Sequence, residues 1–240
     1  MKLLAIDTST SCAGICIYED NKVLAELNIN NDKKTHSQKL IPYINNLLKE
    51  FGFKVSDFDI FAVTTGPGSF TGLRIGITTV KIFSYIYKKP LVGVTTLDTM
   101  VYNYHFSEKI LCPIIDARNS QVYTSIYTNN GHLDRITDYM AIHIDELIKI
   151  LNNFNREIIF LGDGIDKHRD FLDKTIKSKC FFSPANLKFQ KSSSLATLAY
   201  EMYLRGEVSN SFKLEPFYLR KSQAERIRDE RLKENKNGKN

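Results

Sequence analysis

The order of predicted strands and helices limits the fold of this chain more than any single motif does. Residues 3–7, 12–18 and 23–28 are strand-like, and residues 40–51 carry apolar side chains at helical spacing. A buried strand follows at residues 59–65, then a helix at 71–87 and a short strand at 91–94. All-apolar or alternating runs predict strands, whereas i, i+3, i+4 spacing predicts helices. The first hundred residues therefore have the order βββαβα.

Nearly the same order returns in the rest of the chain. Strands are predicted at residues 110–116, 121–127, 133–140 and 157–161, and helices at 145–154, 166–176 and 193–205. Two halves that share an order of elements predict a duplicated α/β fold of two ribonuclease-H-like lobes. We expect an N-terminal lobe at residues 1–100, a C-terminal lobe at 101–219 and a charged tail at 220–240. Two unrelated α+β halves are the less favoured alternative.

Composition excludes several classes of protein. No run approaches the roughly 18 apolar residues that span a bilayer, and the first residues lack the features of a secretory signal. The four cysteines form no C-x-x-C pair, which favours reduced thiols in the cytoplasm. Of the net charge of +6, residues 220–240 supply +4, from eight Lys/Arg and four Asp/Glu. A solvated tail is favoured over an RNA contact there, and the near-neutral body argues against a direct RNA-binding protein.

A glycine-rich block, Thr64 to Gly76, joins the buried strand to the following helix. Gly66 and Gly68 leave backbone N–H groups uncovered, and Ser69 is able to cap the helix. That geometry suits a phosphate at a helix N-terminus, although no Gly-Lys-Ser/Thr follows as in a P-loop. Alternatively, the glycines let another backbone approach closely. The two interpretations are equally supported by the sequence.

Two further strand-end turns carry polar side chains. Asp7, Thr8 and Ser9 follow the first strand, where α/β folds place ligands. They form either a remnant phosphate loop or a hairpin turn in which side chains bond local backbone. Asp116 and Arg118 occupy the equivalent turn of the second half, where they either contribute to a phosphate loop or pair with each other.

The helix predicted at 71–87 has two apolar faces. One face is expected to pack against the sheet. The other must be covered as well, either by the preceding helix or by a second protein chain. The second face consists of Ile75, Thr79, Ile82 and Ile86. This is the best indication of partner binding in the sequence.

No catalytic constellation is evident. The five histidines are scattered with no i, i+4 pair, so no metal site is predicted. The sequence has no Gly-x-Ser-x-Gly elbow and no cysteine in a recognisable nucleophile context.

Several of these segments resemble the TsaB (YeaZ) family, from residue 3 to about residue 220. The glycine-rich block of eleven residues is the most specific match. The matching segments are Leu4–Thr10, His36-Ser37 with Leu40 and Pro42, Gly66–Gly76, Asp116–Arg118 with Val122-Tyr123, and Pro216–Arg220. The resemblance implies the duplicated actin and sugar-kinase ATPase-like fold. TsaD-like paralogues hold a catalytic metal with a histidine pair, and Thr96 and Met100 stand at those positions here. Neither replaces an imidazole ligand, so the resemblance implies a non-catalytic subunit without a cofactor.

The resemblance also implies a role and a set of partners. The role is formation of N6-threonylcarbamoyladenosine at position 37 of tRNAs that read ANN codons, by supporting a TsaD-like catalytic subunit. A TsaE-like ATPase joins the complex, tRNA is contacted only through the complex, and the free chain forms a homodimer. The interface is expected on the two N-lobe helices, through Leu40, Ile44, Leu47, Ile75, Thr79, Ile82 and Ile86. The alternative function is a small-molecule phosphotransferase that uses Asp7 and Asp116 with Mg-ATP.

Overall fold

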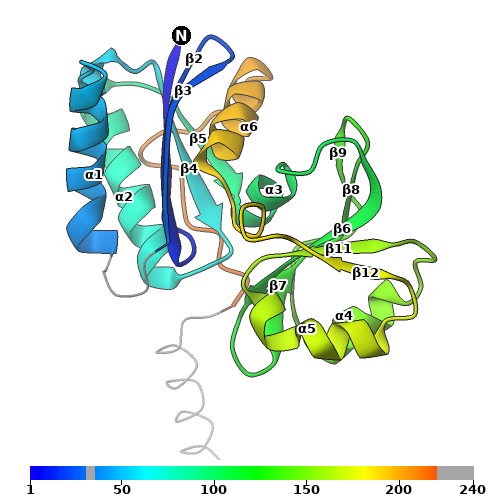
Figure 1. Ribbon diagram of the computed structural model, residues 1–240. Helices are drawn as coiled ribbons and strands as arrows, with labels where there is room; N and C mark the ends of the chain where they lie inside the picture. The colour runs from blue at the N-terminus through cyan, green and yellow to red at the C-terminus, as the bar shows by residue number, and fades with distance from the viewer. Residues whose placement is uncertain (31–35, 221–240) are drawn as a thin grey trace, which may run out of the picture.

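The computed structural model describes residues 1–30 and 36–220, which form two lobes, each built on a mixed β-sheet (Figure 1). The first lobe contains β1 (Lys2–Asp7), β2 (Cys12–Glu19), β3 (Lys22–Asn30), α1 (His36–Glu50), η1 (Val55–Asp57), β4 (Ile60–Gly66), α2 (Phe70–Tyr87), β5 (Leu91–Thr95) and α3 (Thr96–Val101). The second contains β6 (Ser107–Asp116), β7 (Gln121–Thr124), β8 (Tyr127–Asn129), β9 (Leu133–Arg135), β10 (Met140–His143), α4 (Ile144–Leu151), β11 (Ile158–Leu161), α5 (Gly164–Thr175) and β12 (Cys180–Phe182). The last helix is α6 (Ser192–Leu204).

The two sheets have equivalent strand orders. The first is β3-β2-β1-β4-β5, and the main path of the second is β10-β7-β6-β11-β12. In both, the central strand pairs antiparallel with the strand that follows it and parallel with the strand after the first long helix. This topology confirms the predicted duplicated ribonuclease-H-like fold. The second lobe adds the short strands β8 and β9, which pair with each other.

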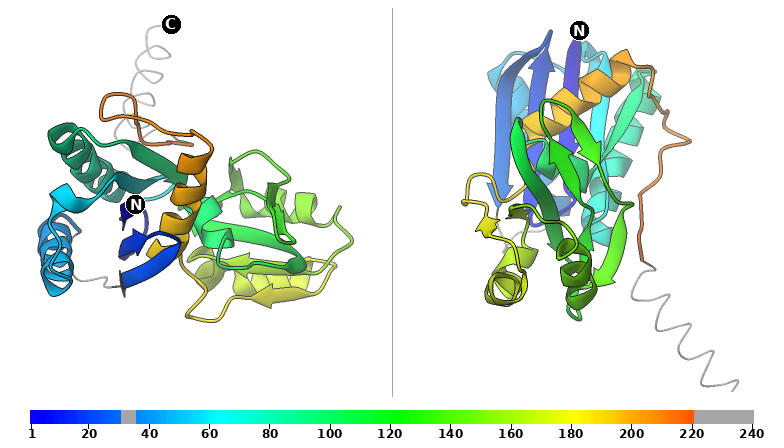
Figure 2. Two further views of the ribbon diagram at one scale, coloured as in Figure 1. Left: turned by 90° about the horizontal axis from the view of Figure 1, so that it is seen from above. Right: turned by 90° about the vertical axis from the view of Figure 1, so that its right-hand side faces the viewer.

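Helices cover the sheets in layers. Helices α1 and α2 lie side by side on one face of the first sheet, and α6 lies on its other face (Figures 1 and 2). Both faces of β1 and β4 are covered, and the two strands are almost entirely buried, with apolar runs at residues 3–6 and 60–63, as expected for central parallel strands. Helices α4 and α5 lie along one side of the second sheet, and α3 lies between the lobes (Figure 1). Within the described residues, no helix is both long enough and apolar enough to cross a membrane.

Two of the predicted strands are each divided in the structure. The segment predicted at 121–127 becomes β7 and β8, and the segment predicted at 133–140 becomes β9 and β10. Both divisions occur where Ser125 and Thr137 face each other. The Ser125 hydroxyl donates to the carbonyl of Thr137 at 2.7 Å, and the Ile126 amide donates to the Thr137 hydroxyl at 3.0 Å. Side chains thus replace the ladder bonds at this point, and the two segments stay paired with each other on either side of it.

Pro42 lies inside α1 rather than at its start. It has no N–H group to donate to the carbonyl of Gln38. Both residues are exposed, so water has access to this side of the helix. The helix consequently continues through the proline to Glu50.

The chain returns to the first lobe after β12. Helix α6 packs against the first sheet, and Leu214 is buried in the core beneath α1 and α2. The Ser209 amide donates to the Leu91 carbonyl at 2.8 Å, and the Phe217 amide donates to the Thr65 carbonyl at 2.7 Å. Residues 192–217 therefore contact the first lobe, although the predicted division assigned them to the second. The lobe boundary itself stays a prediction, and residues 221–240 of the predicted tail lie outside the described residues.

Candidate functional site

The glycine-rich block forms the turn between β4 and α2. Gly66 ends the strand with a φ of 120°, a conformation that favours glycine. Ser69 caps the helix, as expected, because its hydroxyl accepts a hydrogen bond from the Gly72 amide at 3.2 Å. The turn therefore has the local geometry from which a helix N-terminal phosphate site is built.

The turn after β1 packs directly against the glycine-rich turn. The Ser69 amide donates to the Ser9 carbonyl at 2.7 Å, and the Thr8 hydroxyl donates to the Gly72 carbonyl at 2.7 Å. A Cβ atom on Gly68 would lie 2.1 Å from the Ser9 carbonyl oxygen, and one on Gly72 would lie 2.0 Å from the Thr8 carbonyl oxygen. The glycines thus serve close packing between backbones. Of the two interpretations of the block, the structure supports the packing one.

Asp7 is fully enclosed beneath this contact. Its Oδ1 accepts hydrogen bonds from the Ser9 amide at 2.8 Å, from the Ser9 hydroxyl at 2.7 Å and from the Thr64 hydroxyl at 2.8 Å. Burial raises the pKa of the carboxyl, and these hydrogen bonds oppose the rise. Gln190, from the segment before α6, closes the turn by donating to the Thr10 hydroxyl at 2.6 Å. Asp7, Thr8 and Ser9 form a turn bonded to itself and to α2 rather than an open loop.

The second strand-end turn is more open. The Asp116 amide donates to Asp163 Oδ1 at 2.9 Å, and the Arg118 amide donates to Asp116 Oδ1 at 3.1 Å. Asp116 forms its ion pair with Lys167 of α5, and among the described residues no ion pair joins it to the guanidinium of Arg118, which was one of the two alternatives. Burial raises the pKa of Asp163. No contact between Asp7 and Asp116 is observed among the described side chains, because each carboxylate is held within its own lobe.

The positions of the TsaD-like histidine pair do not fit a metal. Thr96 begins α3 and Met100 lies one turn later, and both side chains are completely buried. A hydroxyl and a thioether are poor ligands for a hard or borderline divalent ion. Residues 1–30 and 36–220 contain no group of three or more His, Cys, Asp or Glu side chains that could hold a metal ion.

The outer face of α2 exposes apolar side chains. Ile82 is 50% exposed and Ile86 60% exposed, whereas Leu73, Ile77 and Val80 are buried against the sheet. Ile75 and Thr79 are half-buried on the outer face. Tyr85 and Phe212, which the sequence analysis did not select, extend this face with their rings in edge contact at 5.9 Å.

The contribution of α1 to that face differs from the prediction. Leu40 and Ile44 are only 2% and 3% exposed and belong to the core of the first lobe. They are therefore almost fully covered within the lobe, although Leu40 also lines a groove between α1 and α2, and their place in a partner interface stays a prediction. Leu47 is half-buried, and Ile41, one residue from Leu40 along the helix, is exposed instead. The helical pattern contained Ile41, but periodicity alone did not show which edge of the apolar stripe faces the sheet.

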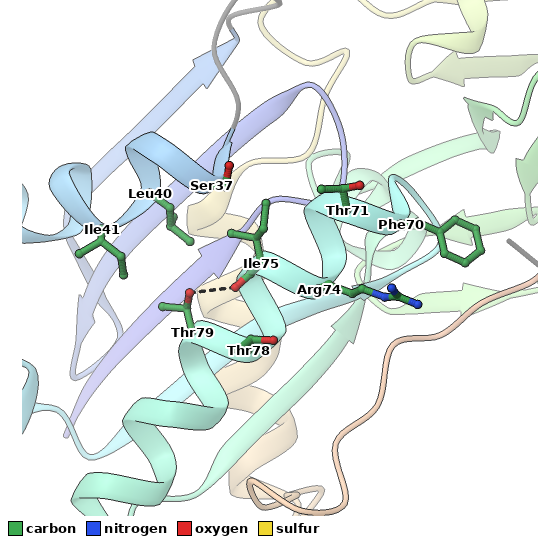
Figure 3. Close-up of a pocket in the computed structure, with 9 residues that line it drawn as sticks. All are labelled: Ser37, Leu40, Ile41, Phe70, Thr71, Arg74, Ile75, Thr78 and Thr79. Atoms are coloured by element: carbon green, nitrogen blue, oxygen red, sulfur yellow. Dashed lines mark hydrogen bonds between the residues drawn. The ribbon is translucent and has the colours of Figure 1, made fainter. Parts of the chain in front are cut away.

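A groove of about 500 Å³ runs between the N-terminal halves of α1 and α2 (Figure 3). Leu40 and Ile41 lie on one side, Ile75 and Thr79 at the centre, and Phe70 and Arg74 at the opposite rim (Figure 3). The remaining lining residues are Ser37, Thr71 and Thr78. Among the described residues that line the groove, Arg74 is the one that carries a charge.

A second cavity, of about 440 Å³, lies between the lobes. Its wall includes Asp98 of α3, which accepts hydrogen bonds from Tyr127 at 2.7 Å and Tyr139 at 2.6 Å. Burial and the adjacent Asp98 raise the pKa of Tyr139 to about 12, so both hydroxyls remain donors at neutral pH. This network joins the two lobes. No local sequence signal could reveal it, because its residues come from separate segments.

Two sheets of equivalent strand order place the chain among the duplicated ribonuclease-H-like α/β proteins. The profile of the family described as "TsaD: tRNA N6-adenosine threonylcarbamoyltransferase" matches residues 22–227. The chain is 32% identical to "tRNA threonylcarbamoyladenosine biosynthesis protein TsaB" of Bacillus subtilis, over 94% of this chain and 96% of that protein. The chain belongs to the TsaB (YeaZ) family.

Two other similarities place the chain within this group. A solved structure of YeaZ from Pseudomonas aeruginosa has a TM-score of 0.75 at 23% identity and covers 91% of this chain and 99% of its own. A tRNA N6-adenosine threonylcarbamoyltransferase from Persephonella marina is 30% identical, over 56% of this chain and 43% of that protein. The first similarity confirms the fold, and the second relates the chain to the transferase.

Proposed function

We propose that this chain is a non-catalytic subunit in the formation of N6-threonylcarbamoyladenosine at position 37 of tRNAs that read ANN codons. It binds and supports a TsaD-like catalytic subunit. The observation that carries the proposal is the exposed apolar outer face of α2. It lies on a lobe in which the turn after β1 is closed by its packing against α2. The similarity to TsaB proteins, which are named for this biosynthesis, supports the same role.

The chemistry of the strand ends supports a non-catalytic role. The Ser69 amide and the Thr8 hydroxyl, which are donors of the kind that a phosphate needs, are engaged by the carbonyls of Ser9 and Gly72. Thr96 and Met100 offer no metal ligands of the kind that a TsaD-like site requires. The same packing argues against the phosphotransferase alternative, because Asp7 cannot reach Mg-ATP without opening the turn. Isothermal titration of the isolated chain with Mg-ATP tests this; micromolar binding with turnover would favour the phosphotransferase.

The outer face of α1 and α2 is the proposed docking surface. Large apolar side chains exposed in one patch mark sites of protein association. Ile82 and Ile86 provide the most exposed part of the patch. The same face would join two copies of this chain when the catalytic subunit is absent, so homodimer and heterodimer would compete. A TsaE-like ATPase joins the assembled complex, and tRNA is bound through the complex rather than by this chain alone.

Substitution of Ile82 or Ile86 by aspartate tests the docking surface. Because both side chains are exposed, each variant should keep the fold while the buried charge disfavours the complex, weakening binding by about 100-fold or more. Phe171→Asp on α5 is the matched control, since Phe171 is similarly exposed, on the second lobe. Binding to the TsaD-like protein of the same cell is measured by calorimetry, and modified adenosine in tRNA by mass spectrometry after complementation. Unchanged binding and modification in both isoleucine variants would refute the proposal.

A further inference from the structure

The segment Pro216–Arg220, which follows the last helix, holds the rim of the groove between α1 and α2. The Tyr218 ring stacks on the Phe70 ring with centroids 4.3 Å apart and planes 11° apart. The Tyr218 hydroxyl accepts a hydrogen bond from Nε of Arg74 at 3.1 Å. Arg74 and Phe70 both line the groove. One side chain from the C-terminal segment therefore orients two residues of the proposed docking surface.

Tyr218 is itself held firmly at this position. The preceding residue donates its amide to the Thr65 carbonyl at 2.7 Å, and a Cβ atom on Gly66 would lie 2.6 Å from the Phe217 carbonyl oxygen. The Phe217 ring contacts Tyr139 of the second lobe at 5.3 Å. On the other side, Arg220 donates to the Ala117 carbonyl at 2.7 Å. The segment is thus anchored to both lobes on either side of Tyr218.

Within the described part of the chain, the Arg74 guanidinium forms its hydrogen bond to Tyr218 through Nε, and its two terminal nitrogens are available. Among residues 1–30 and 36–220, no carboxylate forms an ion pair with Arg74. Arginine binds carboxylates through two parallel N–H groups, and a guanidinium that is already oriented loses less conformational entropy on binding.

The two helices that form the groove, α1 and α2, carry a net positive charge, as Arg74 does. The sequences of α1 and α2 contain four cationic side chains and a single acidic one. These residues are Lys39, Lys49, Arg74, Lys81 and Glu50. A partner that approaches this face meets positive potential around an apolar groove, which favours an acidic surface on the partner.

We propose that the partner's docking segment carries a carboxylate among apolar side chains, that this carboxylate binds the Arg74 guanidinium, and that Tyr218 positions it. This inference rests on the proposed function, because the partner is the TsaD-like protein. It adds the chemistry that the groove recognises and a role for the Pro216–Arg220 motif. Arg74 is the contact residue, and Tyr218 acts through it.

The test compares Arg74→Gln, Tyr218→Phe and the double variant in binding to the purified TsaD-like protein. Arg74→Gln should raise the Kd by roughly tenfold or more, and Tyr218→Phe by a smaller factor. In the Arg74→Gln background, Tyr218→Phe should have no further effect, because its role is to orient Arg74. Arg156→Gln, which removes a charge from the second lobe, and Tyr203→Phe, on α6, are the matched controls.

Salt dependence separates this role from a purely structural one. The wild-type Kd should rise between 50 and 300 mM NaCl more steeply than that of Arg74→Gln, because an ion pair has been removed from the variant. If Arg74→Gln bound with the same affinity and the same salt dependence as the wild type, the inference would be overturned. Loss of binding in Ile82→Asp would in that case still uphold the docking surface. If the wild type does not bind the TsaD-like protein, both proposals fall. If a short RNA bound at Arg74 in place of the TsaD-like protein, the inference would also be overturned, since the site would then recognise phosphate.

Discussion

Gly72→Ala is the sharpest test of the packing between α2 and the turn after β1. In an ordinary helix interior, alanine is more favourable than glycine by about 1 kcal/mol. Here the new methyl group would lie 2.0 Å from the Thr8 carbonyl oxygen. The neighbour is backbone, so the turn or the helix must shift by more than an ångström. Overpacking of this kind destabilises a core by about 1–3 kcal/mol.

The shift also stretches the hydrogen bond from the Thr8 hydroxyl to the Gly72 carbonyl, which contributes about 1 kcal/mol. After subtraction of the helix preference, we expect a net loss of about 2 kcal/mol in the free energy of unfolding. With a urea m-value of about 2–3 kcal/mol/M for a chain of this size, the midpoint falls by roughly 0.8 M.

Urea unfolding followed by circular dichroism measures that change. Thr78→Ala is the control, because Thr78 lies on the exposed side of the same helix and its substitution should change stability by no more than about 0.5 kcal/mol. A Gly72→Ala midpoint equal to or above that of the wild type would show that the turn moves freely. The packing interpretation would then be wrong, and the phosphate interpretation would regain its support.

Two further predictions concern buried titratable groups. Because burial raises the folded-state pKa of Asp7, the folded protein binds this proton more tightly than the unfolded chain, and stability should fall as pH rises above about 4. Asp7→Asn keeps an acceptor oxygen and removes the charge, so the stability of the variant should lack this decline and should equal or exceed that of the wild type at pH 7. Urea unfolding at pH 4 to 8 measures this, and the same dependence of stability on pH in both proteins would contradict the prediction. Cys180, which is half-buried with a pKa raised by burial to about 11, should react with an aromatic disulfide reagent before the three fully buried thiols, as labelling and mass spectrometry would show. Those thiols are Cys12, Cys16 and Cys112.

Local patterns predicted the parts of this fold that depend on neighbouring residues. Helix α2 shows this most clearly: its spacing predicted two apolar faces, and Leu73, Ile77 and Val80 are buried whereas Ile82 and Ile86 of the second face are exposed. The order of elements likewise predicted the duplicated fold, because strand and helix periodicity are properties of short segments. The absence of histidine ligands at Thr96 and Met100 is also a fact of the sequence alone.

Contacts between distant segments decided what the sequence left open. Whether the glycines of residues 66–76 bind phosphate or backbone depended on where the turn after β1 lies, about sixty residues earlier. The burial of Leu40 and Ile44 depended on the rotation of α1 against the sheet, and the partner of Asp116 proved to be Lys167. The role of Tyr218 required a segment that returns from the far end of the chain to α2. Periodicity records which side of an element is apolar, whereas the identity of the neighbour that covers it is settled only when the whole chain packs.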